Sequence, residues 1–313
     1  MLRKILKWTG IVLLVLITGV TITTIARQHL KFEAPYPDIK ASRDSSIIAR
    51  GKHLVIGPGH CADCHSPVRN VDSLLALGQE VPLTGGNQFD LPFGQFYTRN
   101  LTPDVETGIG AMTDGEIARV LRHSVKKNGE AVLPFMPFQN MSDEDLTAIV
   151  SYLRSLKPVR NQVPEHKYNL VGRLIKAYMI KPSGPTEQVK KAVKEDSTVE
   201  YGRHMVLAVA NCNECHTRRD GIGTFVGEPM AGGNVFKEKG KPDLISPNLT
   251  PHPSSHIYNW SEETFLKRFR MGKVIPHSHM PWEAYGRMSD IEIKAIYKYL
   301  KTLKPVPTEK SNK

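Results

Sequence analysis

Residues 57–67 read GPGHCADCHSP and contain the spacing Cys-x-x-Cys-His. The same spacing returns at residues 212–216, CNECH, so that all four cysteines of the chain fall in two identical groups. Three chemistries use cysteines at this separation: covalent haem attachment, zinc coordination and a redox-active dithiol. No cysteine is left over for a structural disulfide, so the choice among these three decides what kind of fold surrounds the motifs.

The two motifs belong to an internal repeat. In both halves of the chain the same segments follow one another: Gly-x-His, Cys-x-x-Cys-His, Gly-Gly-Asn, Asn-Leu-Thr-Pro, Met-Pro and Lys-Pro-Val. The offset between the copies stays between 144 and 151 residues, so insertions and deletions are small. The sequence therefore predicts two copies of one domain, at residues 46–159 and 198–306.

Helical signals dominate each copy. A middle stretch begins at the capping residue Thr113 or Ser261, and a last stretch begins at Ser142 or Ser289 and stops at a Lys-Pro pair. No run of alternating apolar and polar residues indicates strands. We therefore predict an all-α protein with two tandem domains behind an N-terminal transmembrane helix, and we expect one modest core in each domain.

A glycine lies in the first helical stretch of each copy, Gly51 and Gly202, and the stretch is expected to end near it. Because glycine has no Cβ, another helix could cross closely at this point. A helix C-cap is the alternative role, since glycine readily adopts the left-handed conformation found there.

Residues 1–30 are predicted to be a membrane anchor with its flanks. The apolar run at residues 8–26 has 19 residues, which span roughly 28 Å as a helix and match the roughly 30 Å hydrocarbon core of a bilayer. A cleaved signal peptide is the alternative, but an A-x-A-like cleavage site does not follow the run. Three basic residues precede the run and two follow it, which predicts a single pass through the cytoplasmic (inner) membrane with the domains on the periplasmic side.

The remaining segments connect these parts. Residues 31–45 form a proline-containing tether, residues 160–197 a linker and residues 307–313 a tail. Within the linker, the stretch YNLVGRLIKAYMI places apolar side chains such as Val171 and Leu174 on one face of a helix. We expect a connecting helix packed on a domain, with a membrane-surface or partner-docking role as the alternative.

The surroundings of the cysteines favour haem. Zinc needs four ligands, but the two motifs lie 151 residues apart in separate copies, and the βαβ context of a redox dithiol is missing. In c-type attachment, two cysteines one helical turn apart bind the haem vinyl groups and the adjacent histidine becomes the proximal iron ligand. The sequence thus predicts two covalently bound haem c groups, attached at Cys61, Cys64, Cys212 and Cys215, with His65 and His216 as proximal ligands.

The predicted ligands on the other side of the irons are Met136 and Met280. Each precedes a proline, occupies the same place in the repeat and follows its proximal histidine by 71 or 64 residues. Methionine opposite histidine is the ligand pair that raises the potential of a cytochrome. An ordinary core methionine is the alternative, and in the second copy His277 or His279 could supply a bis-histidine iron.

These motifs resemble class I cytochrome c in a tandem dihaem form, over residues 46–159 and 198–306. In that family CADCH and CNECH attach haem, and the methionine before proline is the distal ligand. Within the family, the segment NLTPDVETGIGAMTDGEI resembles the cytochrome c subunits of membrane-bound alcohol, aldehyde and gluconate dehydrogenases. Those subunits carry three haem domains, whereas this chain has two Cys-x-x-Cys-His motifs.

The expected function is electron transfer between redox proteins in a respiratory or dehydrogenase chain. With histidine and methionine on both irons, no coordination position is open for a substrate, so we assign no catalytic residue. The alternatives are a dihaem redox enzyme such as a peroxidase, or a cytochrome subunit of a larger dehydrogenase or oxidase complex.

The charge of the chain bears on its partners. The net charge is +11, and four basic residues gather just before the second Met-Pro, namely Lys267, Arg268, Arg270 and Lys273. Such a cluster would steer an acidic redox partner, for example a membrane dehydrogenase, an oxidase or a soluble cytochrome. A solvated helix face is the alternative. Nucleic acid is not expected, because no stacking aromatics accompany a basic face.

Overall fold

The structure, a computed structural model, describes residues 1–221, 223–238 and 240–308. In the N-terminal part the elements are α1 (Leu2–Arg27), α2 (Ser45–Ile56), α3 (Cys61–His65), α4 (Val71–Ala76), β1 (Gln88–Leu91), β2 (Gly94–Tyr97), α5 (Asp114–His123), α6 (Asp143–Ser155), β3 (Lys167–Tyr168) and α7 (Leu170–Tyr178). The second half contains α8 (Val199–His204), the π-helical turn η1 (Met205–Val209), α9 (Asn213–His216), β4 (Val235–Phe236), β5 (Leu244–Ile245), α10 (Glu262–Arg270), α11 (Trp282–Tyr285) and α12 (Asp290–Thr302). Residues 309–313 of the predicted tail lie outside the described residues.

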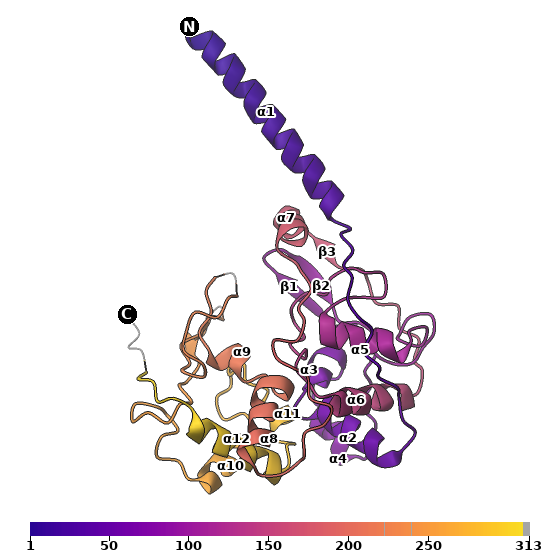
Figure 1. Cartoon of the computed structure of the whole chain (residues 1–313), viewed down its shortest axis with the longest axis vertical. Helices are drawn as coiled ribbons and strands as arrows, with labels where there is room; N and C mark the ends of the chain where they lie inside the picture. Colours follow the sequence, from indigo (N-terminus) through magenta and orange to yellow (C-terminus); the bar gives the residue numbers. More distant parts are fainter. Residues whose placement is uncertain (222, 239, 309–313) are drawn as a thin grey trace.

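The two halves of the chain lie side by side, and α1 projects away from the first half (Figure 1). The fold is mostly helical, as predicted, but the all-α prediction missed short strands. β1 and β2 form an antiparallel hairpin, and β3 from the linker pairs with β2. At Gly94 a Cβ would lie 2.2 Å from the carbonyl oxygen of Lys167, so β3 can approach only because this position has no side chain.

The predicted helix starts are confirmed. The hydroxyls of Thr113, Ser142, Ser261 and Ser289 each accept a hydrogen bond from a backbone N–H in the first turn of the helix that follows. These bonds satisfy donors that would otherwise have no partner at the helix start. The last helix of each half, α6 or α12, ends two residues before its Lys-Pro pair.

Gly51 and Gly202 are points of close helix crossing. A Cβ at Gly51 would lie 1.9 Å from the carbonyl oxygen of Ala148 in α6, and one at Gly202 would lie 1.9 Å from that of Ala295 in α12. The predicted close crossing is confirmed. The expected helix end at the glycine is wrong, because α2 continues to Ile56 and α8 continues into η1.

The buried apolar residues of both halves form one connected cluster. It includes Leu54 and Leu146 from the first half and Met205 and Ile293 from the second. The expectation of two separate cores is therefore wrong. The physical reason is that the halves meet through the same helices that carry their cores, α2 and α6 on one side and α8 and α12 on the other.

Polar contacts between the halves are reciprocal. His53 Nε2 lies 2.8 Å from Glu292 Oε2, and His204 Nε2 lies 2.6 Å from Asp145 Oδ2. The two histidines are equivalent in the repeat, and so are the two carboxylates. A histidine of each half therefore binds the equivalent carboxylate of the other half, as in a two-fold symmetric dimer. Arg50 adds an asymmetric contact, 3.0 Å from Glu292.

The predicted tether is not a free spacer. Its backbone follows the first half: the N–H of Phe32 donates to the carbonyl of Gly129, and Ile39 is buried. The guanidinium of Arg119 lies 4.6 Å from the centre of the Tyr36 ring. These contacts connect α1 to the first half through an ordered segment.

Candidate functional site

Both Cys-x-x-Cys-His motifs form short helical turns, α3 and α9. The chain enters each turn through a residue in the left-handed region, His60 with φ 40° and Asn211 with φ 51°. None of the four cysteines forms a disulfide. Among the residues that the structure describes, no three or more His, Cys, Asp or Glu side chains are grouped to hold a metal ion, so a zinc site is not supported.

The histidine of each motif is oriented by a backbone carbonyl. His65 Nδ1 lies 2.8 Å from the carbonyl oxygen of Arg99, and His216 Nδ1 lies 2.9 Å from that of Pro247. Burial lowers the pKa of both imidazoles, although these hydrogen bonds raise it in part. A neutral imidazole that donates from Nδ1 keeps the lone pair of Nε2 available for a metal, which is how an iron ligand is held.

The leading cysteines lie in apolar surroundings. Burial raises the pKa of the Cys61 and Cys212 thiols to about 12, with a smaller contribution from the neighbouring cysteine. At neutral pH these groups are protonated thiols, which does not suit a redox dithiol, whose chemistry needs the thiolate. Thioether attachment uses the sulfur in a neutral, covalently bonded form. The residues present therefore fit haem c better than the two alternatives.

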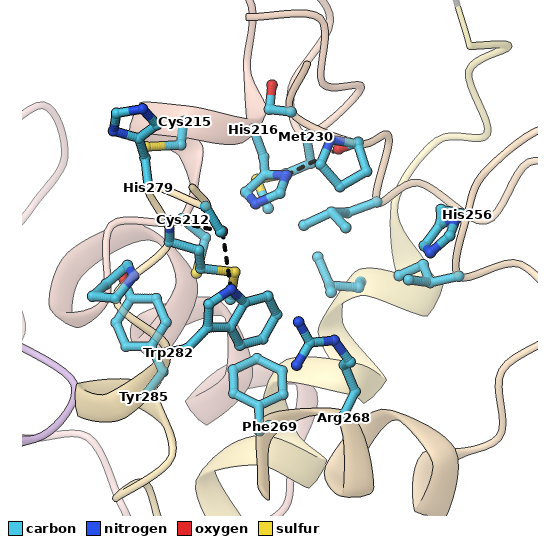
Figure 2. Close-up of a pocket in the computed structure, with 18 of the residues that line it drawn as sticks. Cys212, Cys215, His216, Met230, His256, Arg268, Phe269, His279, Trp282 and Tyr285 are labelled. Atoms are coloured by element: carbon cyan, nitrogen blue, oxygen red, sulfur yellow. Dashed lines mark hydrogen bonds between the residues drawn. The ribbon is translucent and has the colours of Figure 1, made fainter. Parts of the chain in front are cut away.

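In the second half the predicted site residues come together around one cavity (Figure 2). His216 lies on one wall, opposite Trp282 and Phe269. The cavity wall is mostly apolar or aromatic, and it includes the complete predicted attachment and ligand set, Cys212, Cys215, His216 and Met280. His279 also lines this cavity and stacks on the ring of Phe236 at a centroid distance of 5.2 Å, so a bis-histidine iron stays an alternative.

Met230 is a second methionine in the cavity wall. Its side chain is 1% exposed, and its backbone N–H donates to the hydroxyl of Thr217. The equivalent residue in the first half is Leu83, which is also fully buried. Because leucine cannot coordinate iron, the repeat indicates a core role at this position, in contrast to Met280.

In the first half the corresponding residues lie on corresponding elements. Cys61 and Met136 are both partly buried and pack against the shared apolar core. The loop that contains Met136 is fixed by Gln139, whose side-chain amide donates to the Met136 carbonyl at 3.0 Å.

Two asparagines that the sequence interpretation did not single out hold the motifs in place. The side-chain amide of Asn87 donates to the carbonyls of Cys64 and Ser66, at 2.6 Å each. Asn234 makes the same pair of bonds to Cys215 and Thr217, at 2.7 Å each. The repeated Gly-Gly-Asn could have pointed to these two asparagines in the sequence. Both glycines of each copy have positive φ, a conformation that glycine adopts readily.

The Asn-Leu-Thr-Pro segments position the carbonyls that orient the histidines. Asn100 and Asn248 directly follow Arg99 and Pro247 in the sequence. Each asparagine is 2% exposed, and its amide donates to the carbonyl of the valine in Lys-Pro-Val, at 2.8 and 2.7 Å. The repeated segments thus form a supporting layer behind the two histidines.

Two side chains of the basic cluster at residues 267–273 make contacts within the protein. The guanidinium of Arg268 lies 3.5 Å from the centre of the Trp282 ring and lines the cavity. Arg270 donates to the carboxylate of Asp290 at 2.5 Å. These two side chains have a structural role, so the expected steering surface is smaller than the sequence indicated.

Comparison with known proteins agrees with this geometry. Residues 202–300 match the family model described as cytochrome C oxidase, cbb3-type, subunit III. The second half of the chain is therefore a cytochrome c domain. The match includes one of the two Cys-x-x-Cys-His motifs, together with the cavity and Met280.

Over most of its length the chain is related to cytochrome c subunits of dehydrogenases. It is 32% identical to the cytochrome c subunit of alcohol dehydrogenase (quinone) from Gluconobacter oxydans, over 86% of this chain and 57% of the relative. It is 26% identical to the fructose dehydrogenase cytochrome subunit of Gluconobacter japonicus, over 90% of this chain and 58% of the relative. The chain thus spans less than two thirds of these subunits. A diheme cytochrome c-type protein of Cereibacter sphaeroides is 27% identical over 78% of both chains. The resemblance read from the motifs is confirmed.

Proposed function

We propose that this chain is a membrane-anchored dihaem c-type cytochrome that transfers electrons between redox proteins. The observation that carries the proposal is the cavity in which two thiols, an oriented imidazole and a methionine sulfur meet within an apolar wall. The repeat supplies the same residue types a second time, so residues 46–159 and 198–306 are assigned as two cytochrome c domains.

The residues have the following roles in this proposal. The four cysteines would attach the two haem groups through thioether bonds, and His65, His216, Met136 and Met280 would be the protein ligands of the irons. A haem c held in this way supplies the one-electron redox step. The chain holds each imidazole through a backbone carbonyl at Nδ1, which would leave Nε2 free to bind iron, and the aromatic side chains that line the second cavity would limit the access of water to it.

The two proposed sites are connected by a short aromatic contact. Tyr285 lines the cavity of the second half, and its ring meets that of His60 edge to face at a centroid distance of 5.8 Å. His60 directly precedes Cys61, an attachment residue of the first half. The hydroxyl of Tyr285 donates to the carbonyl of Ala210 at 2.6 Å, which fixes the ring. This arrangement supports electron exchange between the two haems within one molecule.

The partners and the location follow from the relatives and from α1. Relatives whose names place them in alcohol, fructose and gluconate dehydrogenases support a dehydrogenase as electron donor. Helix α1 is long and apolar enough to cross a membrane, and its most apolar 18-residue stretch has a mean hydropathy of 2.2. The excess of basic residues before it supports a periplasmic location for the haem domains.

The haem count and the partner can be tested on the same preparation. The full chain is purified from the membrane in mild detergent, and its intact mass is measured with the proteins that co-purify. We expect a mass increase of two haem groups and a co-purifying dehydrogenase. The matched control replaces Cys212 and Cys215 by serine, and it should carry one haem. A wild-type chain with fewer than two attached haems would contradict the proposal.

A further inference from the structure

Helix α7 exposes an apolar face that the rest of the described chain leaves largely uncovered, with contacts from α1 only at its Tyr178 end. The exposed fractions are 75% for Leu170, 55% for Val171, 38% for Leu174 and 42% for Tyr178. At about 100° per residue, these four side chains fall within one stripe about 100° wide along the helix. The opposite side is fixed to the first half, since a Cβ at Gly172 would lie 2.0 Å from the carbonyl oxygen of Phe93.

This face lies beside the end of α1. The hydroxyl of Tyr178 is 2.8 Å from that of Thr23. Arg27 Nε donates to the carbonyl of Ala177 at 2.9 Å, and the side-chain amide of Gln28 donates to the carbonyl of Arg173 at 2.8 Å. Figure 1 shows α7 where α1 joins the globular part. The position of α7 relative to the candidate membrane span is therefore set by direct contacts.

The contacts also place α7 at a defined level along α1, close to the end of its apolar run. Thr23 precedes Ala26, the last residue of the apolar run, by three positions, or about 4.5 Å along a helix. A helix lying in the membrane interface buries its apolar face about 5–10 Å into the boundary between headgroups and acyl chains. Tyr178 has the amphipathic ring that is common at this depth.

The charges around α7 fit an anionic lipid surface. The stretch from Asn169 to Lys181 contains three basic residues and no acidic one; Lys176 pairs with Glu130 of the first half at 3.7 Å, which leaves Arg173 and Lys181 to face lipid headgroups. Arg27, at the end of α1, places its guanidinium 5.3 Å from the centre of the Tyr178 ring. Basic side chains at the edge of an apolar face are typical of helices that bind anionic membranes.

We infer that α7 lies in the interface of the bilayer that α1 spans, with Leu170, Val171, Leu174 and Tyr178 in contact with lipid. This inference rests on the membrane anchor proposed above. Because α7 is also fixed to the first half, it would hold the haem domains at one orientation to the membrane, which α1 alone could not do. The alternative role named from the sequence, a membrane-surface helix, is thereby preferred to a purely connecting one.

Spin labels can test the position of α7. The full-length holoprotein is placed in nanodiscs of phosphatidylcholine and anionic phosphatidylglycerol. Single cysteines are introduced by Leu174→Cys in α7, Leu14→Cys in α1 and Ile291→Cys in α12, whose exposed fraction of 45% is close to that of Leu174. The native cysteines are taken up by haem in the proposed protein, so each variant carries one label. Val171→Cys is a second probe in case the first variant does not fold.

The measurement is the collision rate of each label with oxygen, which concentrates in lipid, and with a water-soluble nickel complex. For Leu174 the ratio of oxygen to nickel collisions should exceed that for Ile291 by at least about threefold, because the label lies among acyl chains. A ratio at Leu174 equal to that at Ile291, with a lipid-type ratio at Leu14, would overturn the inference and leave the anchor intact. Protection of Leu174 from both reagents would also overturn it, because protein would then cover the face. A water-type ratio at Leu14 would reject the anchor and the inference together.

Discussion

Asn87 acts on the attachment turn through two carbonyls, and this role can be tested by removing its donors. We expect Asn87→Asp to destabilise the holoprotein by about 1–3 kcal/mol, because the Cys64 and Ser66 carbonyls lose their partner and face a carboxylate instead. Thermal unfolding of the whole holoprotein, followed by circular dichroism, gives the measurement. Asn70→Asp is the control, since Asn70 serves only as an acceptor that caps α4. Equal stability of the two variants would argue against a stabilising role for the two hydrogen bonds of Asn87.

Met280 is the residue whose replacement tests the proposed iron ligand. Met280→Ala should lower the potential of one haem by about 0.1 V or more, within the roughly 0.8 V range that axial ligands span, and leave the other nearly unchanged. Spectroelectrochemical titration measures both potentials. Met230→Leu, which changes another sulfur in the same cavity wall, should leave both potentials in place. Equal shifts of the two potentials in Met280→Ala would contradict the assignment of one site to each half.

The residues proposed to hold haem could be singled out from the sequence because their signal is local. Two cysteines and a histidine in one turn are defined by their spacing alone, and the repeat identified the methionines. The support behind the histidines could not be predicted in the same way. Asn87 lies more than 20 positions from the carbonyls it binds, and its amide looks like that of any loop asparagine until the fold brings them together.

At the scale of elements, the crossing of α2 and α6 depends on a missing side chain. Gly51→Ala would place a methyl group 1.9 Å from the carbonyl oxygen of Ala148, so the two helices must move apart. Overpacking of this kind costs about 1–3 kcal/mol, and chemical denaturation of the holoprotein should show it. Gly115→Ala in α5 is the matched control, because the nearest atom to its Cβ is at 3.4 Å; it should be neutral or slightly stabilising. A similar loss in both variants would mean that crossing distance is not the cause.

Helix starts were predictable and the short strands were not, for a physical reason. A capping hydroxyl satisfies donors two or three residues away, so Thr113 and Ser289 mark a boundary within a few positions of sequence. The pairing of β3 with β2 joins residues about 70 positions apart. It becomes favourable only after the linker has folded onto the first half, and two-residue strands carry no periodicity of their own.

At the scale of the whole molecule, two buried carboxylates connect the halves. Burial raises the pKa of Asp145 and of Glu292, but hydrogen bonds from His204 and His53, with the charge of Arg50, outweigh burial and leave both pKa values below normal. A carboxylate whose folded pKa is depressed stabilises the fold while it is ionised. That stabilisation is complete above the ordinary values of 3.8 and 4.5 and is lost as the pH falls through the lower folded values.

We therefore expect acid to weaken the contact between the halves. Below about pH 4.5 the free energy of unfolding should fall with pH, and hydrogen exchange should increase first in α2 and α8. Glu292→Gln should mimic this loss at neutral pH, costing about 3 kcal/mol, because Glu292 is fully buried and its partners lose their counter-charge. The exposed Glu144→Gln is the control and should change stability by less than about 0.5 kcal/mol. Unchanged stability of Glu292→Gln would show that the ion pairs do not hold the halves together.

The two equivalent contacts between the halves, His53 with Glu292 and His204 with Asp145, make the molecule resemble a homodimer whose subunits have been fused. In a true homodimer one gene encodes both sides, so any substitution appears twice and damages both contacts. Here each of two equivalent positions has its own codon, so one contact can change while the other still holds the two halves together. Position 50 and its counterpart 201 already show this freedom: one is arginine and the other tyrosine, and the Arg50 guanidinium donates a hydrogen bond of 3.1 Å to the Tyr201 hydroxyl. Covalent fusion also makes the pairing independent of protein concentration, so the two halves, each with its own Cys-x-x-Cys-His motif, stay matched one to one however dilute the protein is.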